Sequence, residues 1–222
     1  MPGILLVDKA AGWTSFDVVN KIRFQVAKAE GKKPKSVKVG HCGTLDPFAT
    51  GLLVILVGKE NTRKAEQYSK LDKTYEVTMK LGETSTTGDP EGEITTVSDR
   101  KPKIEEIEAA LNQFVGDIQQ TPPAFSAIKV NGQRAYKLAR EGKEVVLEPR
   151  KITINRLELV DYNYPEVKFT ADVSSGTYIR SLVEDIGKAL QTGAYTSALR
   201  RTKIGDFSIK DAKSVAQLTA VL

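Results

Sequence analysis

The chain has 222 residues, of which 40% are hydrophobic and 27% charged, the balance of an ordinary globular protein large enough to bury a core. One cysteine excludes an internal disulfide, and with only one histidine it also excludes a thiolate–imidazole zinc cluster. We therefore expect no metal and a reducing, cytoplasmic compartment. The 33 lysines and arginines outnumber the 28 acidic residues, and this excess favours an anionic partner, nucleic acid first.

The sequence contains no pattern typical of a membrane span, a secretory signal or a nucleotide-cofactor site. The longest apolar run, Leu52–Val57, is too short to span a bilayer, and the N-terminal residues lack the pattern of a secretory signal. The glycine-rich fingerprints that bind phosphates or dinucleotides do not occur, and no acidic cluster suggests magnesium. We expect no cofactor.

Hydrophobic periodicity predicts strands and helices that are mixed along the chain without strict alternation. Strands are expected at Ile4–Val7, Leu52–Val57, Tyr75–Leu81, Ile152–Val160 and Val167–Val173. Helices are expected at Ser15–Val26, Ile104–Val115, Ala135–Glu141, Ile179–Leu190 and Asp211–Leu222. This mixture favours an α+β fold around a large mixed or antiparallel sheet over a doubly wound one.

The stretch Thr121–Arg150 differs in character from the rest of the chain. It opens on two prolines, and Asn131-Gly132 is a tight-turn signal between two short extended segments. We expect it to leave the core as an arm. No linker separates two cores, so one domain over residues 1–222 is predicted, with the insertion at 121–150 inside it.

The loop Gly40–Gly51 gathers the rarest residue types of the chain. Any imidazole mechanism must use His41, and the adjacent Cys42 is an unlikely partner because neighbouring residues rarely point at the same atom. Asp46 precedes Pro47, which pushes it toward extended geometry. This aspartate either caps local amides in a turn or presents a carboxylate to a pocket, and His41 is either structural or functional.

A second candidate site lies at Ser174–Leu182, where a predicted strand ends and a helix begins. Gly176 permits the turn, so Tyr178 and Arg180 could both face a pocket at the end of the strand. An arginine near Asp46 would hold that carboxylate in its charged form, and a tyrosine could stack on a base or transfer a proton. The plainer alternative is a core tyrosine beside a surface arginine.

Other features allow two interpretations as well. Tyr75 shares a strand face with apolar residues and is either core or the wall of a pocket, and Leu199 is ordinarily a packed leucine. The lysines within Lys28–Lys38 and the run Arg200–Lys203 are either phosphate contacts or solvated faces.

These segments together resemble the bacterial tRNA pseudouridine-55 synthase (TruB) family, and they extend over nearly the whole chain. The loop GHCGTLDPFATG at 40–51 is the core of the resemblance. It continues in KTY (73–75), GETSTTGD (82–89), QTPPAFSAIK (120–129), GTYIR (176–180) and LRRT (199–202).

The resemblance implies a pseudouridine synthase fold with a thumb-like RNA-binding insertion, and an isomerase that converts uridine 55 in the T-arm loop of tRNA to pseudouridine by base flipping. It implies Asp46 as the catalytic aspartate, Tyr178 in proton transfer and Arg180 as the partner of Asp46. Further substrate contacts are implied for His41, which would hold the flipped loop, Tyr75, which would stack on uracil, Leu199, which would line the pocket, and Lys73, Thr44 and Gly43.

Two departures from the family pattern and two rival functions remain. Lys9-Ala10 stands where relatives commonly have Lys-Pro, and the chain stops at Leu222 where many relatives continue into a PUA-type module, which we expect to be absent. The rivals are a non-catalytic tRNA-folding chaperone and a guide-RNA-dependent pseudouridine synthase, although His41 and the intact insertion favour the stand-alone type. The expected partner is the tRNA T-arm, with no membrane, and the expected state is a monomer.

Overall fold

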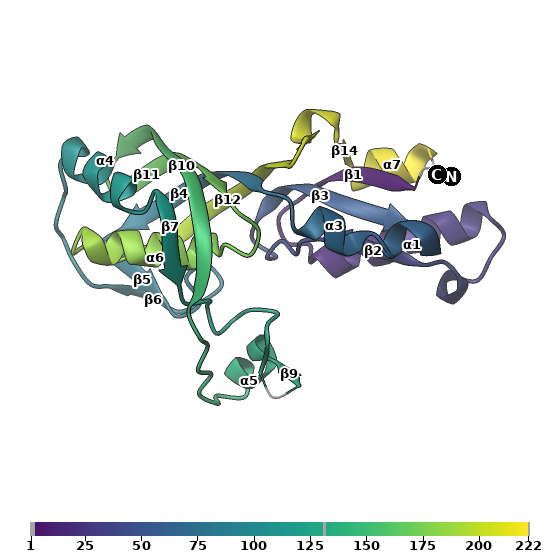
Figure 1. The fold of residues 1–222 in the computed structure, drawn as a ribbon, viewed down its shortest axis with the longest axis horizontal. Coiled ribbons are helices and arrows are strands. Elements are labelled where there is room, and N and C mark those ends of the chain that lie inside the picture. Colours follow the sequence, from purple (N-terminus) through teal and green to yellow (C-terminus); the bar gives the residue numbers. More distant parts are fainter. Residues whose placement is uncertain (1–2, 131, 222) are drawn as a thin grey trace. The chain divides into compact units, whose positions relative to one another are not determined.

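The structure, a computed structural model, describes residues 3–130 and 132–221 (Figure 1). These residues form two compact units. The first contains the chain up to Glu76 and again from Leu199, and the second is Val77–Ala198. Strands β4 (Lys73–Leu81) and β12 (Ala194–Ile204) run from one unit into the other.

The first unit is built on the strand order β14-β1-β3-β12-β4, with β2 paired to β3 and β13 paired to β12. Pairing is antiparallel for β1 with β3 and for β2 with β3, and parallel for β1 with β14 and for β3 with β12. Besides β4 and β12, its elements are β1 (Ile4–Lys9), α1 (Ser15–Ala29), η1 (Pro34–Ser36), β2 (Val39–Cys42), β3 (Thr50–Val57), α2 (Lys59–Thr62), α3 (Ala65–Ser69), β13 (Phe207–Ser208), η2 (Ile209–Asp211), β14 (Lys213–Ser214) and α7 (Val215–Val221).

Strand β3 is the centre of this unit because both of its faces are buried. Leu53, Ile55 and Val57 join one apolar core with residues of α1, whereas Leu52, Val54 and Leu56 join a second with Cys42 and Ile204. A strand covered on both faces has no polar side, which explains why the sequence shows a continuous apolar run here.

Helix α1 begins at a capping box that the sequence specifies. The Asp17 amide donates to the Thr14 hydroxyl at 3.0 Å, and the Asp17 carboxylate accepts the Thr14 amide at 2.9 Å. The buried face of the helix then repeats at helical spacing through Val18, Ile22 and Val26.

The second unit has the strand order β12-β4-β11-β10-β7, and β10 is antiparallel to both β11 and β7. Helix α4 packs against β10 and α6. Besides β4 and β12, the second unit contains β5 (Glu83–Ser85), β6 (Ile94–Thr96), α4 (Ile104–Gln113), β7 (Gly116–Gln120), β8 (Lys129–Val130), β9 (Gln133–Arg134), α5 (Ala135–Arg140), β10 (Arg150–Asn163), β11 (Glu166–Val173) and α6 (Ile179–Ala189).

The insertion leaves the sheet between β7 and β10, and Figure 1 shows α5 and β9 held away from that sheet. Strands β8 and β9 pair as a hairpin, and α5 follows them as the sequence predicts. Residue Asn131 of the predicted turn lies outside the described residues.

The predicted α+β fold with a mixed sheet is confirmed, and two local predictions need correction. The long strand β12 was not expected, because its inward positions include Thr196 and Arg201 and so hide the apolar alternation. The last helix begins at Val215 rather than Asp211, because η2 and the short strand β14 precede it.

Candidate active site and RNA-binding surface

The loop that carries Asp46 joins β2 to β3, and a buried serine fixes its backbone. The Ser15 hydroxyl accepts the Leu45 amide at 2.8 Å and donates to the Leu45 carbonyl at 3.1 Å. Directly after Asp46 the chain turns, and the Ala49 amide donates to the Asp46 carbonyl at 3.2 Å. Leu45, the residue before the candidate catalytic aspartate, is therefore held at both backbone groups, while Asp46 itself is only half-buried.

The far side of the same loop is tied to the chain that follows β1. The Pro47 carbonyl accepts the Gly12 amide at 2.9 Å and the Lys9 ammonium at 3.3 Å. Lys9 is 0% exposed, and its ammonium also donates to the Trp13 carbonyl at 2.7 Å. A buried charge costs free energy unless polar groups surround it, so these carbonyls hold Lys9 and are held by it.

Arg201 supports the loop from strand β12. It is 1% exposed, and its guanidinium donates to the Leu52 carbonyl at 2.8 Å and to the Gly43 carbonyl at 3.0 Å. Gly51 pairs with Arg201, has a φ of +104°, and a Cβ there would lie 2.3 Å from the Arg201 carbonyl oxygen. Only glycine fits such a close approach.

This finding replaces both interpretations of Arg200–Lys203, phosphate contacts and a solvated face, for its two arginines. Arg201 is enclosed, and Arg200 forms a half-buried ion pair with Asp8 at 2.8 Å that ties β12 to β1. Both guanidinium groups organise the fold around the loop. A run of lysines and arginines in a sequence suggests a solvent-exposed surface. A residue of the run is nevertheless buried where the sheet register places it inside the protein, as it does Arg201.

His41 and Cys42 lie on β2, directly before the loop. Burial, and next the Arg201 charge, lower the pKa of His41, and its Nδ1 is buried with no hydrogen-bond partner among the described residues. Cys42 packs in the second core, and burial raises the pKa of its thiol to about 11. The thiol is therefore protonated at neutral pH, which supports the exclusion of Cys42 as a nucleophile.

Lys73 lies close to the loop glycine Gly43 and is itself buried. The Lys73 ammonium donates to the Ser69 carbonyl at 2.7 Å and to the Leu71 carbonyl. Burial, followed by the charge of Arg201, lowers its pKa to about 8. The ammonium thus binds the carbonyl of Ser69, the last residue of α3. The role of Lys73 as a substrate contact stays a prediction.

Seven predicted site residues fall in the first unit and two in the second. Tyr75 and Leu199 are buried and Thr44 is exposed. The first unit holds His41, Gly43, Thr44, Asp46, Lys73, Tyr75 and Leu199, whereas Tyr178 and Arg180 belong to the second. The pairing of Asp46 with Arg180 stays a prediction.

In the second unit, Arg180 lies near the start of α6 and is buried among polar groups. It is 4% exposed and pairs with Asp89 at 3.4 Å, and its guanidinium donates to the carbonyls of Thr87 at 2.7 Å and Phe125 at 2.8 Å. Sequence reasoning missed Asp89, although it ends the GETSTTGD segment. Its carboxylate also accepts the Thr87 hydroxyl at 2.6 Å.

Tyr178 is the N-cap residue of α6, and Gln120 contacts its backbone. The Tyr178 amide donates to the Gln120 side-chain carbonyl at 2.8 Å, and the Gln120 amide nitrogen donates to the Tyr178 carbonyl at 3.0 Å. Sequence reasoning missed this residue too. The only available signal was its position at the head of the QTPPAFSAIK segment.

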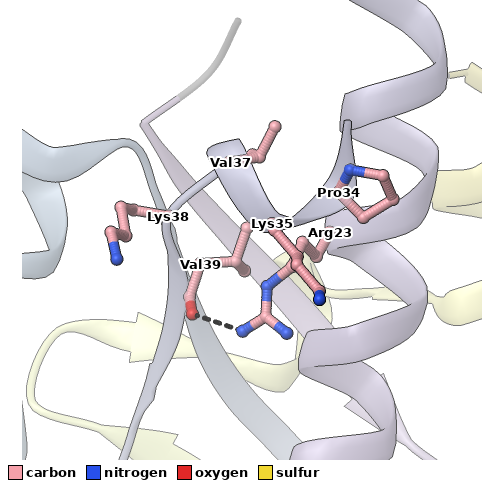
Figure 2. A pocket seen from close by; sticks show the side chains of 6 residues that line it. All are labelled: Arg23, Pro34, Lys35, Val37, Lys38 and Val39. Carbon is pink, nitrogen blue, oxygen red and sulfur yellow. Dashed lines mark hydrogen bonds between the residues drawn. The ribbon is translucent and has the colours of Figure 1, made fainter. Parts of the chain in front are cut away.

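A basic pocket of about 430 Å³ lies in the first unit, where the predicted lysine-rich stretch reaches β2. Figure 2 shows Arg23 extended toward the Val39 carbonyl, to which it donates at 3.3 Å. The titratable groups in its wall are all cationic. Its lining is Arg23, Pro34, Lys35, Val37, Lys38 and Val39.

Over residues 3–130 and 132–221, His, Cys, Asp and Glu side chains form no group of three or more suited to holding a metal ion. Within the same ranges, no helix is both long enough and apolar enough to cross a membrane.

The model of the TruB family pseudouridylate synthase N-terminal domain matches residues 31–179. The chain belongs to the TruB family. Residues 180–222 match the model of the tRNA pseudouridylate synthase B C-terminal domain. The family and the enzyme class predicted from the sequence, an isomerase that forms pseudouridine, are confirmed.

Curated TruB relatives align over almost the entire chain. The tRNA pseudouridine synthase B of Phocaeicola vulgatus is 46% identical over 213 residues, which cover 96% of this chain and 89% of that protein. The enzyme of the same name from Aquifex aeolicus is 44% identical over 219 residues, with 98% and 73% covered.

Solved structures support the fold. A Cbf5-Nop10-Gar1 complex contains a chain that matches with a TM-score of 0.72 at 27% identity, and an H/ACA RNP bound to a substrate RNA containing 2'-deoxyuridine matches at 0.70 and 26%. Each match covers 98% of this chain but only 54% and 52% of the solved chains, so this chain spans about half their length.

Proposed function

We propose that this TruB-family protein converts uridine 55 in the T-arm loop of tRNA to pseudouridine, with Asp46 as the essential carboxylate. The observation that carries the proposal is the Asp46 loop. Its backbone is fixed at Leu45 by Ser15 and at Pro47 by Lys9, and Asp46, which lies between these two anchors, is a half-buried residue. Such fixation holds a reacting group in place at little further entropic cost.

The chemistry of the isomerisation is compatible with the residue types of the candidate site, a carboxylate and a tyrosine. The C1′–N1 bond of uridine breaks, a C1′–C5 bond forms, N1 gains a proton and C5 loses one. The atoms balance without an oxidant, reductant or co-reactant. A carboxylate, a proton relay and a pocket for an extruded base are what this chemistry requires.

The remaining roles follow the family pattern and are part of the proposal. Arg180 pairs with Asp46, Tyr178 moves the proton, Tyr75 stacks on the uracil and Leu199 lines its pocket. His41 holds the flipped loop, with substrate contacts from Gly43, Thr44 and Lys73. The protein works as one catalytic domain with a thumb at 121–150, as a cytoplasmic monomer.

Docking of tRNA uses cationic surfaces that meet phosphates. The pocket of Arg23, Lys35 and Lys38 offers three cations, and Arg23 is partly oriented by its bond to Val39. Phosphate contacts of this kind position an RNA without reading its sequence. Selection of uridine 55 then depends on the shape of the T-loop and its splayed bases.

The decisive experiment measures tritium release from tRNA labelled at C5 of uridine, for the wild type and for Asp46→Asn. We expect release from wild type, with the product mapped to position 55, and none above background from the variant, which should bind tRNA with unchanged affinity. A wild type that binds tightly but releases no tritium would favour a tRNA-folding chaperone. Equal loss of binding and turnover in Asp46→Asn would make Asp46 a structural turn residue.

The same assay on a minimal T-arm hairpin addresses the guide-dependent alternative. Turnover without guide RNA or other proteins is expected, because the matching curated relatives carry the name tRNA pseudouridine synthase B at about 45% identity. Turnover that appears only when a guide RNA is added would overturn this part of the proposal.

A further inference from the structure

The side chain of Gln120 binds both backbone groups of a single residue, Tyr178. Its carbonyl oxygen accepts the Tyr178 amide at 2.8 Å, and its NH₂ group donates to the Tyr178 carbonyl at 3.0 Å. A side-chain amide is the neutral group with a donor and an acceptor spaced for this task. Gln120 is 2% exposed, so water does not compete for either bond.

The clamp sits where the backbone most needs fixing. Gly176, with a φ of +87°, turns the chain, and Tyr178 is then the N-cap residue of α6 at φ −102° and ψ 109°. The Tyr178 side chain makes no cap hydrogen bond at the start of this helix. The direction of its Cα–Cβ bond depends on those two dihedral angles, which the paired bonds to Gln120 restrain.

The residues after Gln120 hold the rest of the first turn of α6. The Ser181 hydroxyl donates to the Thr121 carbonyl at 3.0 Å, and Arg180 donates to the Phe125 carbonyl. The segment 120–125 therefore runs along the helix start and contacts three of its residues, Tyr178, Arg180 and Ser181. Gln120 is the member that contacts Tyr178.

We propose that Gln120 is a positioning residue for catalysis, acting through Tyr178 to direct its phenol at the uracil. This rests on the proposed function. Gln120 itself touches neither substrate nor reacting atoms, so its loss lowers kcat and leaves KM and tRNA affinity nearly unchanged. A misplacement of about 1 Å can cost on the order of 100-fold in rate, which bounds the expected effect.

The experiment measures single-turnover tritium release from tRNA by wild type, Gln120→Leu, Tyr178→Phe and the double variant. Gln120→Leu should slow release between about 10-fold and 100-fold, with tRNA affinity within about twofold. In the Tyr178→Phe background the same change should have almost no further effect, because Gln120 acts through the phenol that is no longer there. A purely structural role predicts instead that the two losses multiply, and that result overturns the proposal.

Gln119→Leu is the matched control, because Gln119 is the exposed neighbour on the same strand. Its rate should equal that of wild type. If Gln120→Leu does not fold, the variant Gln120→Glu tests the proposal instead. When its carboxyl group is deprotonated, a carboxylate oxygen faces the Tyr178 carbonyl and repels it. When the group is protonated, it can donate a hydrogen bond to that carbonyl again.

The rate of Gln120→Glu relative to wild type should therefore recover as the pH falls. A ratio that does not change with pH contradicts the clamp. Wild type is measured first, so an absence of wild-type release counts against the proposed function, whereas normal wild-type release with equal variant rates counts against Gln120 alone.

Discussion

The two units hold their candidate catalytic residues by the same device but treat buried charge differently. In the first, the Ser15 hydroxyl bonds both backbone groups of Leu45, next to Asp46. In the second, the Gln120 amide does the same to Tyr178. The buried cation of the first site, Arg201, donates to main-chain carbonyls, whereas Arg180 in the second also has the carboxylate of Asp89.

This difference shows what each unit is sensitive to. A cation held by carbonyls depends on the backbone path, so the first unit is vulnerable to changes at glycines such as Gly51 and at Ser15. A cation held by a carboxylate depends on charge balance, because removal of that carboxylate takes a counter-charge away from the buried cation. The variants below separate the two cases, from the largest expected effect to the smallest.

The strongest change to the second unit is Asp89→Asn. It keeps the size of the side chain but removes the carboxylate that pairs with Arg180 at 3.4 Å, and we expect a loss of about 3 kcal/mol in the free energy of unfolding with a fall in turnover on the order of 100-fold. Urea unfolding and tritium release measure the two. A stable variant with normal turnover would show that Arg180 does not depend on the Asp89 carboxylate.

Lys73 provides a pH test confined to the first unit. Because burial and Arg201 hold its folded pKa at about 8, below the ordinary lysine value of 10.5, the unfolded state binds more protons between pH 8 and 10.5. The unfolding free energy of wild type minus that of Lys73→Met should rise across this window, by at most about 3 kcal/mol.

Cys42 changes the free energy of unfolding with pH in the opposite sense to Lys73, but it is present in both wild type and Lys73→Met. Its folded pKa of about 11 lies above the ordinary cysteine value of 9.0, so stability falls as the pH rises between these values. The subtraction removes this contribution. A difference that stays flat from pH 8 to 10.5 would mean that Lys73 is not desolvated in the folded protein.

Ser15→Ala tests the clamp of the first unit against that of the second. It leaves the amide and the carbonyl of Leu45 without their partner, and we expect a loss of about 1 to 3 kcal/mol in unfolding free energy and a roughly tenfold fall in kcat with little change in KM. Thermal unfolding and single-turnover rates provide the comparison. An unchanged kcat would indicate that the contacts of Lys9 with Pro47 and of Arg201 with Gly43 hold the Asp46 loop without Ser15.

The smallest effects concern RNA docking by the two units. Lys35→Gln with Lys38→Gln neutralises the basic pocket, and Lys137→Gln with Arg140→Gln is the matched pair in the insertion. Each double variant should reduce the slope of log affinity against log salt by about 1 to 2, because each phosphate contact releases about one counterion. A slope that changes only for the insertion pair would remove the first unit from the docking surface.

Elements with a clean repeat were predictable from the sequence. Helix α1 has a capping box and an apolar face at helical spacing, and β11 alternates without interruption, so local physics decides both. The Asp46 loop was also found from the sequence, because its glycines, its Asp-Pro pair and the neighbouring segments resemble one family. Strand β12 was not, because a buried threonine and a buried arginine occupy its inward positions.

By itself, the sequence determined the family, the fold class and the candidate carboxylate at Asp46, since each of these depends on short segments whose residues act locally. Only the tertiary structure decided which polar residues position that chemistry. Gln120 and Asp89 lie 58 and 91 residues from the groups they hold, and Arg201 lies 158 from Gly43. Burial makes these hydrogen bonds and ion pairs strong. Which polar side chains are buried depends on the sheet register and the helix packing, so the sequence alone does not reveal it.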